Sequence, residues 1–151
     1  MTRGKQWIRL DKQVELLDTP GILWPKFEDR SVGEKLAMTG AIRDEILDST
    51  DLAGKLIDLL EKMYPDAIPN RYFDGGMPEN EQISEETQLL SGSDHERHIA
   101  GILDAIARSR GCLKANGEPD PARAASLLID DFRKAKLGKI TLEKPDDTHY
   151  Y

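Results

Sequence analysis

The sequence predicts a mainly α-helical protein that begins with a short β-hairpin. Apolar residues alternate with polar ones through residues 6–17, which is the period of a strand. In most of the remaining chain they recur every three or four positions, which is the period of a helix. Two Ser-x-x-Glu sequences, Ser31 to Glu34 and Ser93 to Glu96, are typical starts of helices.

The predicted hairpin has strands at residues 6–10 and 14–17, with Asp11 and Lys12 at the turn. Two strands bury too little apolar surface to be stable alone. We therefore expect the hairpin to be what remains of a larger sheet, whose other strands would precede Met1. Residues 18–30 contain two prolines and a glycine and are expected to form a loop.

Two helices are expected between residues 31 and 64. Val32, Leu36, Ile42 and Ile46 can share one face of the first helix, which Ser31 would cap. The second would be capped by Asp51 and would end before Pro65, because the residue that precedes a proline avoids the helical conformation. Its apolar residues repeat at spacings of three and four: Leu52, Leu56, Leu59, Leu60 and Met63.

After an irregular stretch with short helices at residues 68–90, two more helices are expected. Ser93 would cap the first and Gly111 would end it. Asp120 would cap the second, with Pro121 as its first helical residue, and Gly138 would end it. The apolar faces are formed by Ile99, Ile102, Leu103 and Ile106 and by Ala124, Leu127, Leu128 and Phe132. Residues 139–142 are expected to be extended, and residues 144–151 to form a loose tail.

Composition is typical of a soluble globular protein. The 151 residues fit one domain, or a fragment joined to a compact domain, with 38% hydrophobic and 32% charged residues. No apolar run is long enough for a membrane span. The single Cys112 excludes an internal disulfide and fits a reducing compartment. We expect a cytoplasmic monomer.

Charge is distributed unevenly along the chain. The net charge is −7, and most of the acids lie between residues 44 and 96. Basic residues gather in and beside the last two helices: Arg108, Arg110, Lys114, Arg123, Arg133, Lys134, Lys136 and Lys139. The helix dipole alone favours cations at helix C-termini, which is a purely structural explanation. The alternative is a shared patch that contacts nucleic-acid phosphates, and because no aromatic residues lie among these cations, folded RNA fits better than single strands.

His95 and His98 are candidate metal ligands, since they are three residues apart beside Asp94 and Glu96. A zinc site needs four ligands, and Cys112 is distant in sequence. We favour the alternative, a solvated first turn of a helix. Nothing marks Cys112 as a nucleophile, and a small apolar role is expected for it.

The most specific motif is Asp18-Thr19-Pro20-Gly21, which follows an apolar strand. Asp-x-x-Gly after a strand is how nucleotide-binding proteins present a carboxylate and a backbone N–H to a magnesium-bound γ-phosphate. The same four residues also suit an ordinary turn. No G-x-x-x-x-G-K-[ST] phosphate loop occurs in these 151 residues.

Five stretches carry a family resemblance: Gln6-Trp7, Leu17 to Asp29, Leu36 to Asp44, Ala105 to Cys112 and Leu137 to Leu142. Through them the chain resembles the C-terminal portion of the ribosome biogenesis GTPase A family, which are bacterial circularly permuted GTPases. The resemblance covers nearly the whole chain as far as Glu143.

The resemblance implies a nucleotide site. In that family the phosphate loop precedes the Asp-x-x-Gly motif, which explains why the loop is missing from these residues. Thr2 and Asp18 would hold Mg²⁺, and Thr2, Asp18, Thr19, Pro20 and Gly21 would lie at GTP. The chain alone would bind no GTP and would be inactive as a GTP hydrolase.

The resemblance also implies an RNA-binding helical domain similar to the ANTAR fold, which assists late assembly of the large ribosomal subunit by binding ribosomal RNA. The basic residues named above are its candidate contacts. The implied division is a hairpin remnant of an α/β P-loop GTPase domain at 1–30, connecting helices at 31–64, an RNA-binding domain at 65–143 and a tail at 144–151. The alternative is a helical protein-interaction module with no nucleic-acid or nucleotide role.

Overall fold

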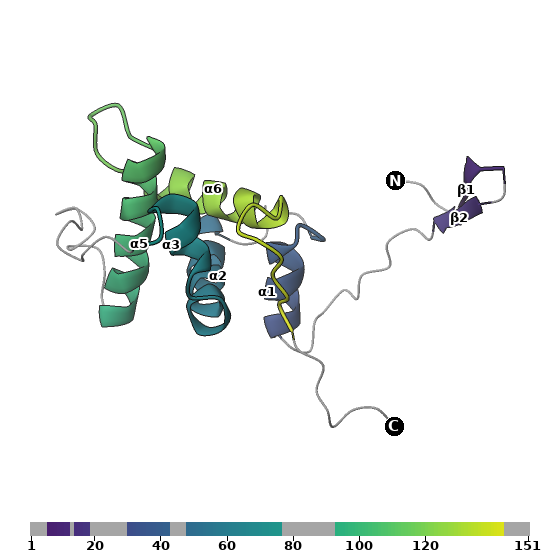
Figure 1. Cartoon of the computed structure of the whole chain (residues 1–151), viewed down its shortest axis with the longest axis horizontal. Helices are drawn as coiled ribbons and strands as arrows, with labels where there is room; N and C mark the ends of the chain where they lie inside the picture. Colours follow the sequence, from purple (N-terminus) through teal and green to yellow (C-terminus); the bar gives the residue numbers. More distant parts are fainter. Residues whose placement is uncertain (1–5, 13, 19–29, 43–47, 77–92, 144–151) are drawn as a thin grey trace, which may run out of the picture. The chain divides into compact units, whose positions relative to one another are not determined.

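The computed structural model describes residues 6–12, 14–18, 30–42, 48–76 and 93–143 (Figure 1). The chain divides into two compact units, residues 1–30 and residues 31–151. Within the described residues the structure is mainly helical, with one small antiparallel sheet, as the sequence predicts.

The small sheet is the predicted hairpin. Strand β1 (Gln6–Asp11) pairs antiparallel with β2 (Val14–Asp18), and Arg9 lies opposite Glu15 as a cross-strand pair of opposite charge. Trp7 lies opposite Leu17 on one face and Ile8 opposite Leu16 on the other. Apolar residues on both faces are typical of strands that a larger sheet buries on both sides.

Helix α1 (Arg30–Met38) begins one residue before Ser31. Ser31 therefore lies in the first turn, and its predicted capping position is wrong. The helix ends in a Schellman motif, in which Gly40 is left-handed (φ 76°) and the N–H of Ala41 donates to the carbonyl of Leu36 at 2.9 Å. The helix therefore stops before Ile42, although the sequence prediction extended it past that residue; Ile46 lies outside the described residues.

Helix α2 (Ser49–Met63) is capped by Asp48, whose side chain accepts from the N–H of Thr50 at 2.7 Å. The predicted cap, Asp51, lies instead in the first turn, because Asp48 already supplies the acceptor. The helix ends at Tyr64 before Pro65, as predicted, and the short helix α3 (Ala67–Tyr72) follows.

Helices α5 (Asp94–Arg110) and α6 (Pro121–Arg133) begin at their predicted caps, Ser93 and Asp120. The Ser93–Glu96 capping box and the left-handed Gly111 (φ 67°) are both confirmed.

The predicted end of α6 at Gly138 is wrong. Ala135 takes the left-handed position (φ 55°), and the N–H of Lys136 closes the motif on the carbonyl of Asp131 at 2.9 Å. Residues 139–142, which were expected to be extended, are not paired as a strand in the described part of the chain. There the N–H of Thr141 donates to the Tyr64 hydroxyl at 3.0 Å instead of pairing with another strand.

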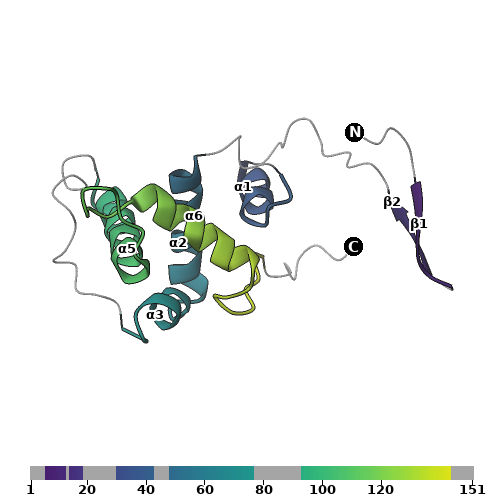
Figure 2. The ribbon, with the colours of Figure 1, turned by 90° about the horizontal axis from the view of Figure 1, so that it is seen from above.

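One hydrophobic core joins the helices of the larger unit. Helix α6 packs on α2 and α5, as Figure 2 shows. Helix α3 packs on α5. The largest fully buried apolar side chains are Leu56, Ile57, Leu60, Leu103, Ile106 and Leu128. Val32, which was predicted to be on the apolar face of α1, is 41% exposed. Two carboxylates, Asp104 and Asp131, are each only 1% exposed.

Candidate nucleic-acid interface

The predicted nucleotide-site residues lie mostly beyond what the structure describes. Thr2, Thr19, Pro20 and Gly21 are outside the described residues. Asp18 is the last residue of β2, so the backbone places it at a strand end, as the Asp-x-x-Gly pattern requires.

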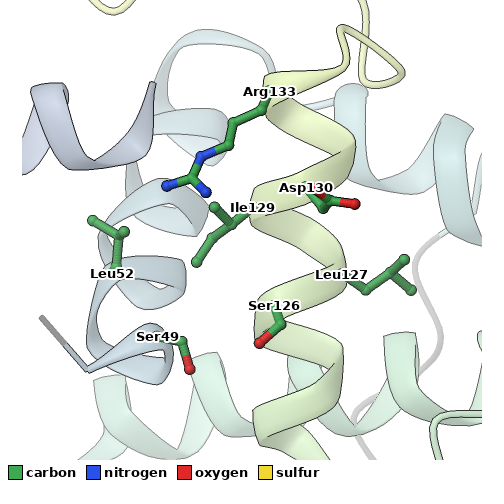
Figure 3. Close-up of a pocket in the computed structure, with 7 residues that line it drawn as sticks. All are labelled: Ser49, Leu52, Ser126, Leu127, Ile129, Asp130 and Arg133. Atoms are coloured by element: carbon green, nitrogen blue, oxygen red, sulfur yellow. The ribbon is translucent and has the colours of Figure 1, made fainter. Parts of the chain in front are cut away.

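The eight predicted RNA contacts do not form one patch of equivalent side chains. Arg133 is half-buried between α6 and α1, where its Nε donates to the carbonyl of Met38 at 3.1 Å and its Nη2 donates to that of Ala37 at 2.7 Å. Figure 3 shows Arg133 reaching from α6, beside a hollow of about 400 Å³ that α2 and α6 line together. These bonds satisfy carbonyls at the end of α1, so Arg133 holds α1 against α6.

Two other predicted residues lie near the N-terminus of α6. The Nη1 of Arg123 donates to the carbonyl of Leu113 at 3.1 Å and ties α6 to the loop at 111–120. Lys114 is an exposed residue of the same loop.

Arg108, Lys134 and Lys139 are exposed side chains. Lys134 forms an ion pair with Asp130 one turn earlier on α6. Lys139 lines a hollow of about 310 Å³ together with Arg133, Thr39 and Thr141.

Of the remaining two, Lys136 bonds to the buried carboxylate of Asp131, and Arg110 lies against the ring of Tyr72. Asp131 accepts at Oδ2 from Arg71 at 2.9 Å and from the Tyr72 hydroxyl at 3.1 Å. Its Oδ1 accepts from the Lys136 ammonium at 2.8 Å. Because the main-chain carbonyl of Asp131 also accepts the N–H of Lys136, the Schellman motif at the end of α6 brings this lysine to the carboxylate.

Tyr72 connects this carboxylate to α5. The guanidinium carbons of Arg110 and Arg71 lie 5.2 Å and 5.9 Å from the centre of its ring, within cation–π range. Arg110 also donates to the carbonyl of Arg71, and the Ser109 hydroxyl donates to that of Tyr72 at 2.7 Å. Two α5 side chains thereby satisfy carbonyls at the end of α3.

We call Arg71, Arg110 and Lys136, with Asp131 and Tyr72 between them, the basic cluster. Three cations against one carboxylate leave it with a net charge of +2. Water reaches all three cationic side chains: Arg71 is 30% exposed, Lys136 is 45% exposed, and Arg110 is an exposed residue. Guanidinium and ammonium groups held close together in this way can donate hydrogen bonds to phosphate oxygens.

Burial by itself raises the pKa of the Asp131 carboxyl, but donation from Lys136, Arg71 and Tyr72 outweighs burial and holds this pKa below its usual range. Burial and the neighbouring Asp131 charge raise the pKa of the Tyr72 hydroxyl. At neutral pH the carboxylate is therefore charged and the phenol is neutral.

Sequence analysis missed Arg71, because it lies in the acid-rich part of the chain. It is 60 residues from Asp131. No local pattern links the two, so only the packing of α3 beside α6 could have identified it.

The two histidines pair with carboxylates across the two helices α2 and α5. The Nε2 of His95 lies 2.7 Å from Oδ1 of Asp58, and the Nε2 of His98 lies 2.8 Å from Oε1 of Glu61. Hydrogen bonding to Asp58 and its charge raise the pKa of His95. In the part of the chain that the structure describes, no three His, Cys, Asp or Glu side chains are grouped so that they could hold a metal ion.

Within residues 6–18, 30–42, 48–76 and 93–143 (residue 13 excepted), no helix has both the length and the apolar character needed to span a bilayer. No protein-family model matches the sequence.

Similar proteins confirm the family resemblance. The chain is 41% identical over 147 residues to ribosome biogenesis GTPase A of Bacillus cereus, which is 97% of this chain and 44% of that protein. It is 42% identical over 147 residues to the protein of the same name from Bacillus licheniformis, covering 97% of this chain and 46% of the relative. A GTP-binding protein of Methanocaldococcus jannaschii is 29% identical over 95% of this chain and 33% of its own length. The chain is therefore a homologue of the ribosome biogenesis GTPase A proteins and spans less than half of their length.

Proposed function

We propose that this chain is part of a GTPase that acts in ribosome biogenesis, and that its helical unit binds ribosomal RNA through the basic cluster. The observation that carries the proposal is the 41% identity to ribosome biogenesis GTPase A over 97% of the chain. The process is late assembly of the large ribosomal subunit in the cytoplasm.

For the complete protein we propose GTP hydrolysis with Mg²⁺ in a circularly permuted domain. Asp18 would act on the metal ion together with Thr2, and Thr19, Pro20 and Gly21 would lie at the nucleotide. The hairpin supports this proposal, because Trp7 is 64% and Leu10 is 63% exposed. Apolar side chains on both faces of two strands fit burial within a larger nucleotide-binding sheet.

For the helical unit we propose an ANTAR-like RNA-binding domain at residues 65–143, preceded by connecting helices at 31–64. The basic cluster supports this proposal because a buried carboxylate holds Arg71 and Lys136, while Arg110 is held by the Arg71 carbonyl and the Tyr72 ring. Phosphate contacts of this kind supply most of the affinity for nucleic acids and little sequence specificity.

The RNA proposal is tested by measuring the affinity for large-subunit ribosomal RNA as a function of salt. Arg110→Gln with Lys136→Gln removes two cations of the basic cluster. The matched control, Lys62→Gln with Arg97→Gln, removes the same charge from exposed residues of α2 and α5 outside the cluster. Log K falls as log salt rises, and each lost phosphate contact makes this slope less steep by roughly 0.7–0.9. The slope of the cluster variant should therefore be less steep by roughly twice that amount, and the slope of the control should be nearly unchanged. Equal slopes for both variants would contradict the proposal.

The GTP proposal has a separate test, because these 151 residues contain no phosphate-loop sequence. Titration of the chain with GTP and Mg²⁺ in a calorimeter should give no binding tighter than about 1 mM. Micromolar binding would show that this chain holds a nucleotide site of its own. It would contradict the expectation that the chain alone binds no GTP.

A further inference from the structure

A groove on the helical unit lies away from the basic cluster. It is lined by α2, the N-terminal half of α5 and the first residue of α6, and has a volume of about 620 Å³. Its floor includes Gly54, Ala100 and Pro121, which are small and only half-buried. At Gly54 the two helices approach closely, since an added Cβ would lie 3.3 Å from Cγ2 of Ile99. The volume of the groove lies within the roughly 300–1,000 Å³ of typical binding pockets.

The rim of the groove is acidic. Asp51 and Asp58 of α2 and Glu96 of α5 line it, while the one lysine of the rim, Lys55, is paired with Glu34. His95 closes one side by bonding to Asp58. An apolar floor with carboxylates around it is complementary to a segment that carries large apolar side chains flanked by cations.

We propose that this groove docks a basic amphipathic segment of a partner protein. A large apolar side chain of the segment would lie over Ala100 and Pro121, and its lysine or arginine side chains would meet Asp51 and Asp58. The carboxylates repel phosphates, so the groove does not serve RNA, and the inference goes beyond the proposed RNA-binding function. It gives the acid-rich part of the chain a partner of opposite charge.

The probe is a short synthetic peptide of lysine, arginine and leucine, with leucines at helical spacings of three and four. A second peptide has serine in place of each leucine and the same charge. Binding of each to the whole chain is followed by fluorescence anisotropy. We expect the leucine peptide to bind at least about tenfold more tightly, since one buried leucine side chain is sufficient for that difference.

Two kinds of variant locate the binding. Asp51→Asn with Asp58→Asn should weaken binding of the leucine peptide by roughly fivefold. The matched control, Asp66→Asn with Asp74→Asn, changes two exposed aspartates that do not line the groove and should leave binding unchanged. Ala100→Trp should fill the groove and weaken binding by about tenfold or more, with circular dichroism checking that the variant folds. The rim pair still tests the proposal if that variant does not fold.

Three results would overturn the inference. One is equal affinity for the leucine and serine peptides, and another is an equal effect of the rim and control pairs. The third is self-association of the chain that Ala100→Trp abolishes, because a second copy would then occupy the groove. None of these outcomes bears on the RNA measurements, which depend on the basic cluster.

Discussion

Replacing Asp131 with Asn tests whether one buried carboxylate organises the basic cluster. Asp131 is 1% exposed and accepts from Lys136 at 2.8 Å, from Arg71 at 2.9 Å and from Tyr72 at 3.1 Å. Asn has nearly the same shape but has no charge and only one acceptor oxygen. The substitution therefore removes the electrostatic part of these bonds without leaving a cavity.

The magnitude follows from how exposed the partners are. Removing one partner of a fully buried ion pair costs about 3–5 kcal/mol, because the other charge is left without compensation. Here Arg71 and Lys136 are 30% and 45% exposed and can turn toward water. We therefore expect Asp131→Asn to lower the free energy of unfolding by about 2–3 kcal/mol.

The assay is urea denaturation of both proteins between pH 7 and pH 3. The pKa of Asp131 is lowered in the folded state. Its contribution is therefore complete above the unfolded-state pKa of about 3.9 and is lost as the pH falls through the lower folded-state pKa. The difference between wild type and variant should be constant near neutral pH and should shrink in acid.

The control is Asp130→Asn, which changes the neighbouring aspartate on the same helix. Its carboxylate is 51% exposed and pairs with the exposed Lys134, so we expect a loss of at most about 1 kcal/mol. The reasoning is refuted if the two variants are equally stable, or if the difference between wild type and Asp131→Asn does not change with pH.

Four further predictions concern single positions. Ala135→Gly should raise the free energy of unfolding by about 0.5–1 kcal/mol in thermal or urea denaturation, because Ala135 has a left-handed backbone at φ 55°. Gly111→Ala should lower the free energy of unfolding by about 1–2 kcal/mol. The cause is backbone strain at φ 67° and not a steric clash, since nothing lies within 4 Å of the added Cβ. Arg133→Lys keeps the charge but loses the two-pronged bond to α1, so stability should fall by about 1–2 kcal/mol while the salt slope of RNA binding stays unchanged; a reduced slope with full stability would contradict this structural role. In NMR titrations, the pKa of His95 should lie above its ordinary value in the wild type and should fall in Asp58→Asn. The ion pair with Asp58 is therefore present at low pH and lost as the pH rises through the raised pKa. An unchanged pKa in the variant would contradict the pairing.

Most of the secondary structure could be predicted because its signals are local. The Ser93–Glu96 capping box, the left-handed Gly111 and the Asp120–Pro121 start of α6 all depend on neighbouring residues and formed as predicted. The wrong helix limits also have local causes. Gly40 ended α1 early, and the left-handed Ala135 ended α6 before Gly138, where the sequence prediction had placed its end.

The sequence by itself determined the helical class, the hairpin, the end of α2, both ends of α5, the start of α6 and the relationship to ribosome biogenesis GTPase A. Only the tertiary structure decided what the charged residues do. Arg133 is bonded to α1, whose Ala37 is 96 residues away, while Arg71 joins Asp131 across 60 residues. The physical reason is that a helix cap depends on residues within one turn, whereas the partner of a long cationic side chain depends on which helices pack together.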